Sequence, residues 1–120
     1  MTRMFNFEKL EVWHKGIALA DTAYSLTKSF PPDERFGLTN QMRRAAVSIS
    51  SNVAEGCSRG SKADFRRFIE IAAGSAFELI SQARIAKEQG MLSSADHDRL
   101  YQVTLEIVRM LTGLRDSLKD

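Results

Sequence analysis

Along most of this 120-residue chain, apolar residues recur every three or four positions, which is the period of an amphipathic helix. Four segments follow the pattern, at roughly residues 7–29, 39–55, 62–89 and 95–118. No segment has the pattern of a strand. The sequence therefore predicts an all-α protein.

The segments are separated by residues that interrupt helices. Pro31 and Pro32 follow the first, Gly56 and Gly60 separate the second from the third, and Gly90 follows the third. Capping signals agree with these boundaries, and they are Thr39, Ser61 with Asp64, and Ser93 with Asp96. Because short connections between long helices favour antiparallel neighbours, we expect one domain over residues 1–120, an antiparallel up-down-up-down four-helix bundle.

Three segments carry more apolar residues than one bundle core requires. The first has two apolar rows, and the fourth adds Tyr101, Leu105 and Val108 to its main face. On the third, Ile71 and Ile85 align with Glu78 and with Gly74, where a second backbone could approach closely. Such surplus apolar surface favours a homo-oligomer. The alternative is a first helix that is broad and fully buried within the monomer.

Basic residues are concentrated in the middle of the chain, although the formal net charge is only +2. Between residues 35 and 67 there are seven basic side chains and two acidic ones. A segment of this kind presents a basic surface to a polyanion, or it forms ordinary solvated helix faces. On the first interpretation, the residues that contact nucleic-acid phosphates are Arg43, Arg59, Lys62, Arg66 and Arg67.

A polar stripe accompanies the apolar face of the second segment. Its members recur at spacings of three or four and are Gln41, Arg44, Ser48, Asn52 and Glu55. A stripe at this position lies at a helix seam, where its members need hydrogen-bond partners. We expect a structural polar network, with Glu78 pairing Arg44 within the bundle or at a subunit seam. The alternative is a ligand or RNA phosphate held by Arg44 and Asn52.

Catalytic, metal and cofactor chemistry is not expected. The histidines His14 and His97 are placed on solvated surfaces, and neither belongs to a zinc-binding or di-iron motif. Cys57 has no base near it in the sequence, and the loop from Gly56 to Lys62 lacks the spacing of a nucleotide-binding loop. Charged residues interrupt the first thirty positions, so neither a signal peptide nor a membrane span is expected, and we expect a cytoplasmic protein.

Several short motifs, taken in order, resemble a known family. They are Phe7-Glu8-Lys9-Leu10-Glu11-Val12-Trp13, Phe30-Pro31, Phe36-Gly37-Leu38-Thr39, Gln41-Met42-Arg43-Arg44-Ala45, Ser48-Ile49, Asn52-Val53-Ala54-Glu55-Gly56, and Gly74-Ser75 with Glu78. The set resembles the four-helix-bundle proteins encoded in intervening sequences of bacterial 23S ribosomal RNA genes. The resemblance implies a homopentameric ring with no established enzymatic activity. That family also looks like the accessory variability proteins of diversity-generating retroelements, whose basic barrels engage nucleic acid and a reverse transcriptase.

Two functions from different classes follow from these observations. The first is a non-catalytic, ring-forming four-helix bundle that binds structured RNA or DNA through a basic surface. The second is a protein-interaction scaffold or adaptor that does not bind nucleic acid. Neither function requires a cofactor.

Overall fold

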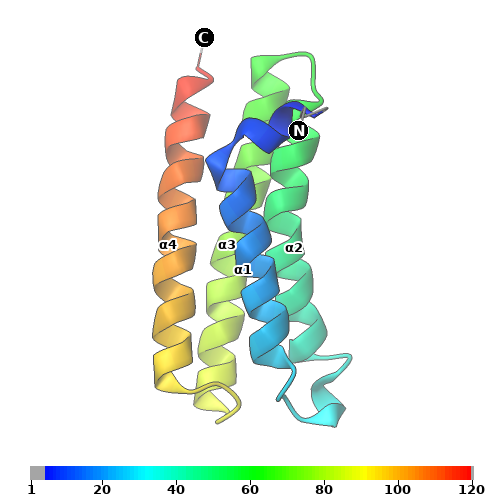
Figure 1. Cartoon of the computed structure of the whole chain (residues 1–120), viewed down its shortest axis with the longest axis vertical. Coiled ribbons are helices and arrows are strands. Elements are labelled where there is room, and N and C mark those ends of the chain that lie inside the picture. Colours follow the sequence, from blue (N-terminus) through cyan, green and yellow to red (C-terminus); the bar gives the residue numbers. More distant parts are fainter. Residues whose placement is uncertain (1–4, 120) are drawn as a thin grey trace.

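The computed structural model describes residues 5–119, and helices account for most of them. Four long helices, α1 (Glu11–Thr27), α2 (Leu38–Cys57), α3 (Lys62–Glu88) and α4 (Ser94–Ser117), are accompanied by two short 3-10 helices, η1 (Asn6–Lys9) and η2 (Pro32–Glu34). The long helices run alternately down and up, and the described residues contain no strand (Figure 1). The predicted all-α four-helix bundle is therefore confirmed.

Two of the predicted helix starts are also confirmed, because a serine caps each of them. Ser61 Oγ accepts a hydrogen bond of 3.1 Å from the Asp64 amide, and Ser93 Oγ accepts one of 3.1 Å from the Asp96 amide. These bonds satisfy amide groups that have no partner inside the helix. Between α3 and α4 the chain turns at Gly90, whose φ of 77° favours glycine.

The other two helix starts differ from the prediction. Leu10 is extended, so η1 stands apart from α1, and Asn6 Nδ2 donates a 3.0 Å hydrogen bond to the Cys57 carbonyl. Thr39 does not cap α2. The helix begins one residue earlier, where Glu34 Oε1 accepts a 3.0 Å hydrogen bond from the Leu38 amide, and Thr39 is buried inside the first turn.

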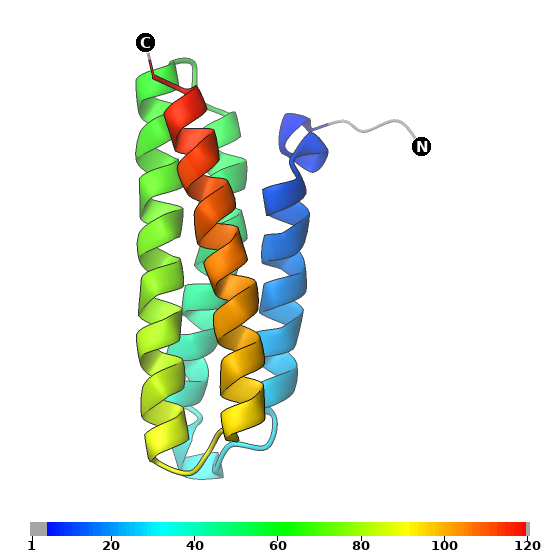
Figure 2. The same ribbon diagram turned by 90° about the vertical axis from the view of Figure 1, so that its left-hand side faces the viewer.

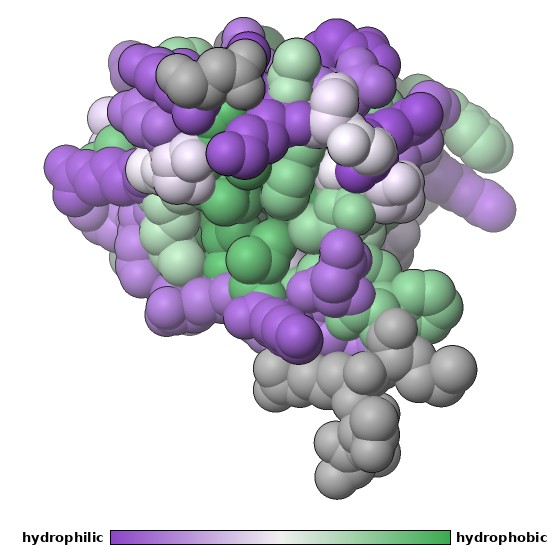
Figure 3. Space-filling view, turned by 90° about the horizontal axis from the view of Figure 1, so that it is seen from above, coloured by the Kyte–Doolittle hydropathy of each residue, from purple (hydrophilic) through white to green (hydrophobic). Residues whose placement is uncertain are grey.

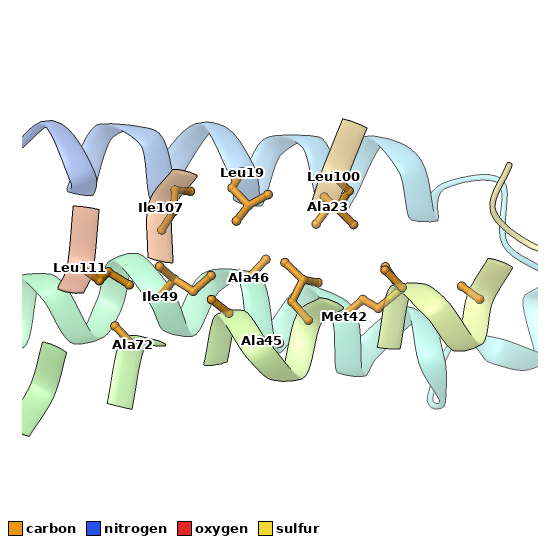
Figure 4. Packing of buried hydrophobic residues seen from close by; sticks show 14 of the residues in the cluster. Leu19, Ala23, Met42, Ala45, Ala46, Ile49, Ala72, Leu100, Ile107 and Leu111 are labelled. Atoms are coloured by element: carbon orange, nitrogen blue, oxygen red, sulfur yellow. The ribbon is translucent and has the colours of Figure 1, made fainter. Parts of the chain in front are cut away.

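The core contains large side chains at its centre and alanines on the buried faces of α2 and α3. Leu19, Met42, Ile49, Leu100, Ile107 and Leu111 are fully buried (Figure 4). Ala45 and Ala46 of α2 and Ala72 and Ala76 of α3 are buried as well, and small side chains let two helices approach closely. All the residues on the apolar face of α2 are buried, namely Leu38, Met42, Ala45, Ala46, Ile49 and Val53.

Each helix packs against the next in sequence, and α4 closes the bundle against α1. Lys15 of α1 and Glu106 of α4 form an ion pair of 3.1 Å across this last contact, and Glu106 raises the pKa of the lysine. With an even number of antiparallel helices, the start of α1, the end of α4 and the α2–α3 connection lie at one end of the bundle (Figures 1 and 2). No helix between residues 5 and 119 has the length and apolarity needed to cross a bilayer.

Candidate nucleic-acid interface

The five residues predicted to contact phosphates lie in two places. Arg59, Lys62, Arg66 and Arg67 surround the connection between α2 and α3. Arg43 belongs to the first part of α2, which puts it about 20 Å away along the helix axis. The single basic segment of the sequence is therefore divided between opposite ends of the bundle.

At the α2–α3 connection, two arginines lie over one aromatic ring. The guanidinium carbon of Arg59 is 4.6 Å from the centroid of Phe68, and that of Arg67 is 4.7 Å from the same centroid. Arg59 Nη2 also lies 3.4 Å from Glu55 Oε1. We call Arg59, Lys62, Arg67 and Phe68 the α2–α3 corner. Stacking on a ring holds a guanidinium plane while its N–H groups remain available to acceptors.

The glycine before the corner makes this arrangement possible. A Cβ added to Gly56 would lie 2.8 Å from Phe65 Cδ1 and 3.0 Å from Phe68 Cβ. The first turns of α3 therefore rest directly on the end of α2. Figure 3 looks onto this end of the bundle, where hydrophilic side chains form most of the rim and apolar side chains fill the centre.

Arg66 points away from the corner and takes part in the fold. It is half-buried, and its Nη1 donates a 2.7 Å hydrogen bond to the Leu118 carbonyl at the end of α4. Helix ends leave carbonyl groups without partners, and a cationic donor is well suited to satisfy one. Lys62, by contrast, is exposed at the start of α3.

Arg43 is held by α1. Its Nε donates a 2.8 Å hydrogen bond to Thr27 Oγ1, its Nη2 lies 3.5 Å from the Tyr24 carbonyl oxygen, and its guanidinium carbon is 4.6 Å from the Tyr24 ring centroid. Thr27 is buried and donates in turn to the Ala23 carbonyl at 2.7 Å. The position of Arg43 is thus fixed by a buried hydroxyl and an aromatic ring.

Part of the predicted polar network exists. Asn52 Nδ2 donates to the Ser48 carbonyl at 2.8 Å and to Ser48 Oγ at 2.9 Å. Ser48 Oγ lies 2.8 Å from Ser75 Oγ, which links α2 to α3, while Glu55 pairs with Arg59. Sequence reasoning missed Ser75 as a member, although the pair Gly74-Ser75 stood out among the motifs.

The remaining members of the predicted network lie outside it. Gln41, Arg44 and Glu78 are all exposed, and no ion pair joins Arg44 to Glu78 in the part of the chain that the structure describes. The pair expected within the bundle is therefore not formed there. A pair across a subunit seam stays a prediction.

The two histidines lie far apart. His14 donates to the Glu8 carbonyl at 2.8 Å at one end of the bundle, and His97 begins α4 at the other. The expectation that His97 is solvated was wrong. It is buried because it lies three and seven residues before the buried Leu100 and Thr104, and its Nδ1 is 3.2 Å from Asp98 Oδ1.

Cys57 is half-buried at the end of α2. Burial raises the pKa of the Cys57 thiol above its ordinary value, which disfavours the thiolate form. Within residues 5–119, no group of three or more histidine, cysteine, aspartate or glutamate side chains is arranged to hold a metal ion.

Two surface depressions complete the description. An apolar groove of about 170 Å³ runs between α3 and α4 and is lined by Ala76, Phe77, Ile80, Tyr101, Thr104, Leu105 and Val108. A larger and more polar groove of about 480 Å³ lies over α1 and α2 and is lined by Tyr24, Asn40, Arg43, Arg44, Val47 and Ser48.

Comparison with known proteins places this bundle in a family. Among solved structures, a protein of unknown function from the S23 ribosomal protein family of Bacteroides thetaiotaomicron matches with a TM-score of 0.76. The two sequences are 21% identical over 85% of this chain and 95% of the other, a likeness that shows the fold alone. No curated protein matches this chain significantly. The sequence model of the family of 23S rRNA-intervening sequence proteins matches residues 8–113, and the chain therefore belongs to this family.

Proposed function

We propose that this protein is a non-catalytic, self-associating binding module that contacts nucleic-acid phosphates through the α2–α3 corner. The observation that carries the proposal is the stacking of Arg59 and Arg67 on Phe68, at 4.6 and 4.7 Å. Planar guanidinium groups held in place lose little freedom when they bind phosphate, and each offers several N–H donors. Lys62 adds a third positive charge beside them.

The composition of the corner favours binding without sequence preference. Its donors are cationic side chains suited to a phosphate backbone, whereas sequence is read by contacts to base edges. Phosphate contacts of this kind release counterions, so the affinity falls steeply as salt rises. The name of the family makes fragments of 23S ribosomal RNA the first probe to use.

The test is fluorescence anisotropy with labelled 23S ribosomal RNA fragments over a series of salt concentrations. For the double variant Arg59→Gln/Arg67→Gln we expect weaker binding and a log–log salt slope that is smaller by about 1 to 2. Arg59→Lys/Arg67→Lys keeps the charge and loses the planar guanidinium groups, so its affinity for RNA should lie between that of the glutamine variant and that of the wild type.

A matched control removes the same charge elsewhere. Arg84 and Arg99 pair with Glu88 and Asp96 near the opposite end of the bundle. Arg84→Gln/Arg99→Gln should therefore bind like the wild type. Equal losses in both double variants would show that only total charge matters, and absence of binding at low salt would refute the proposal.

Self-association rests on apolar side chains that the monomer leaves exposed. Ile71 and Ile85 on α3 are 42% and 51% exposed, and Phe77 is 68% exposed beside the α3–α4 groove. A Cβ on Gly74 would meet nothing within 4 Å, so packing within the described monomer does not require this glycine. These features suit a homo-oligomer, and the family resemblance suggests a pentameric ring.

The apolar α3–α4 groove favours a second candidate function, an adaptor that binds another protein. A groove between two helices, lined by Phe77, Tyr101 and Leu105, suits the apolar face of a partner helix. Affinity purification with and without nuclease distinguishes the two. A protein that stays bound after nuclease treatment and is lost in Leu105→Glu supports the adaptor, whereas RNA lost on treatment supports the first proposal.

A further inference from the structure

The groove over α1 and α2 carries two positive charges that the nucleic-acid proposal does not use. Arg43 and Arg44 both line it, together with Tyr24, Asn40, Val47 and Ser48. None of these lining residues is acidic. A groove that has two arginines and no carboxylate among its lining residues is complementary to an anion.

The two arginines differ in how they are held. Arg43 Nε donates a 2.8 Å hydrogen bond to Thr27 Oγ1, and its Nη2 donates one of 3.5 Å to the Tyr24 carbonyl. A guanidinium has five N–H donors, so the N–H groups of Arg43 outside these two hydrogen bonds are available to a ligand. Arg44 is exposed and has no ion-pair partner among the described residues. One donor group is thus fixed in advance, and the other is free to close on a ligand.

The other lining residues indicate what the anion is attached to. Tyr24 and Val47 are partly exposed apolar surfaces, and Asn40 and Ser48 add neutral polar groups. The volume of about 480 Å³ is within the range that accommodates a small organic molecule. A bare inorganic ion would leave most of this surface uncovered.

We propose that this groove binds a phosphate monoester on a compact organic group, the size of a nucleoside monophosphate. The phosphate dianion takes the N–H groups of Arg43 and Arg44, and the organic part lies against Tyr24 and Val47. Such a monoester occurs in free nucleotides and at the 5′ end of an RNA strand. The site is about 20 Å from the α2–α3 corner and does not depend on it.

Nuclear magnetic resonance titration tests the proposal, with AMP, adenosine, inorganic phosphate and a short oligonucleotide with or without a 5′ phosphate. We expect AMP to shift the amide resonances of Tyr24, Arg43 and Arg44 with a dissociation constant of about 1 mM or below. Binding by the phosphorylated oligonucleotide but not by AMP would identify an RNA end as the source of the monoester. Equal binding of adenosine and AMP, or no shift with any phosphorylated probe, would overturn the proposal.

Arg44→Gln is the deciding variant, because an exposed side chain without a partner can be changed without loss of fold. It should weaken AMP binding by about tenfold or more. Arg109→Gln is the matched control, since Arg109 is an exposed arginine of α4 outside the groove. The corner variant Arg59→Gln/Arg67→Gln should still bind AMP. An Arg44→Gln protein that binds AMP as the wild type does would refute the assignment, whatever the corner variants show.

Discussion

Individual residues matter here through what surrounds them, and two helical glycines show this clearly. Gly56 lies against α3, where an added Cβ would be 2.8 Å from Phe65 Cδ1, whereas an added Cβ on Gly74 would meet nothing within 4 Å. The same substitution at the two positions therefore has opposite effects. At Gly56 it forces the aromatic side chains of α3 to move, and at Gly74 it only removes the backbone freedom of glycine in the unfolded chain.

We predict that Gly56→Ala lowers the free energy of unfolding by about 1 to 3 kcal/mol, while Gly74→Ala raises it by about 0.5 to 1 kcal/mol. Urea unfolding followed by circular dichroism measures both. If Gly74→Ala instead destabilises the protein, and does so more at high protein concentration, the glycine belongs to a contact between copies of the chain.

For single residues, the sequence predicted whether a side chain is buried or exposed. It was least reliable where the answer depends on the direction in which the side chain points. His97 was expected in solvent because first turns of helices are commonly exposed. It is buried because it lies on the same face of α4 as the core residues that follow it. Arg44 was expected to pair with Glu78 within the bundle or at a subunit seam. It is exposed in the monomer, and an exposed ion pair contributes about 1 kcal/mol at most. The stacking of Arg59 and Arg67 on Phe68 depends on rotamers, which periodicity does not specify.

At the scale of elements, the boundaries set by local chemistry were predictable. Ser61 and Ser93 cap their helices through bonds to residues three positions later, so a short stretch of sequence contains the whole signal. The extended Leu10 between η1 and α1 has no such signal, because no proline or glycine precedes it. The extended conformation of Leu10 accompanies a contact between residues far apart in the sequence, the hydrogen bond from Asn6 to the Cys57 carbonyl.

The end of α4 depends on a residue of another helix. Arg66 of α3 donates a 2.7 Å hydrogen bond to the Leu118 carbonyl, which follows the last turn of α4. We predict that Arg66→Ala loosens this turn and lowers the free energy of unfolding by about 1 kcal/mol. Hydrogen exchange should become faster at the amides of residues 114–119 and stay unchanged in the first half of α4. Unaltered exchange at the C-terminal turn, with weaker RNA binding, would return Arg66 to the nucleic-acid interface.

For the whole molecule, the main feature that packing within the monomer does not explain is apolar surface left exposed to water. Phe77 is 68% exposed and adjoins the apolar groove between α3 and α4, whereas Phe36, 85% exposed, projects from the α1–α2 connection. A single exposed aromatic residue is common on soluble proteins, but a side chain that borders an apolar groove marks a contact surface. Sequence periodicity indicated this surplus surface without showing which part of it stays exposed.

Sedimentation velocity checks the assembly directly. We predict that the wild type sediments as an oligomer and that Phe77→Glu shifts it toward the monomer, because the introduced charge would have to be desolvated in the contact. Phe36→Glu should leave the sedimentation coefficient unchanged. A wild-type protein that is monomeric at every concentration tested would exclude self-association. Two variants that sediment alike would show that Phe77 is not part of the contact.

The start of α1 and the end of α4 lie at the same end of the bundle (Figures 1 and 2). The order of the helices along the chain can therefore be changed while their positions in the bundle stay the same. A circular permutant that joins the two ends by a flexible linker and opens the chain at Gly90 keeps all four helix–helix contacts. Such a rearranged chain would present new termini at the end of the bundle away from the α2–α3 corner. Fusion partners or surface tethers could then be attached there without crowding the proposed nucleic-acid contacts.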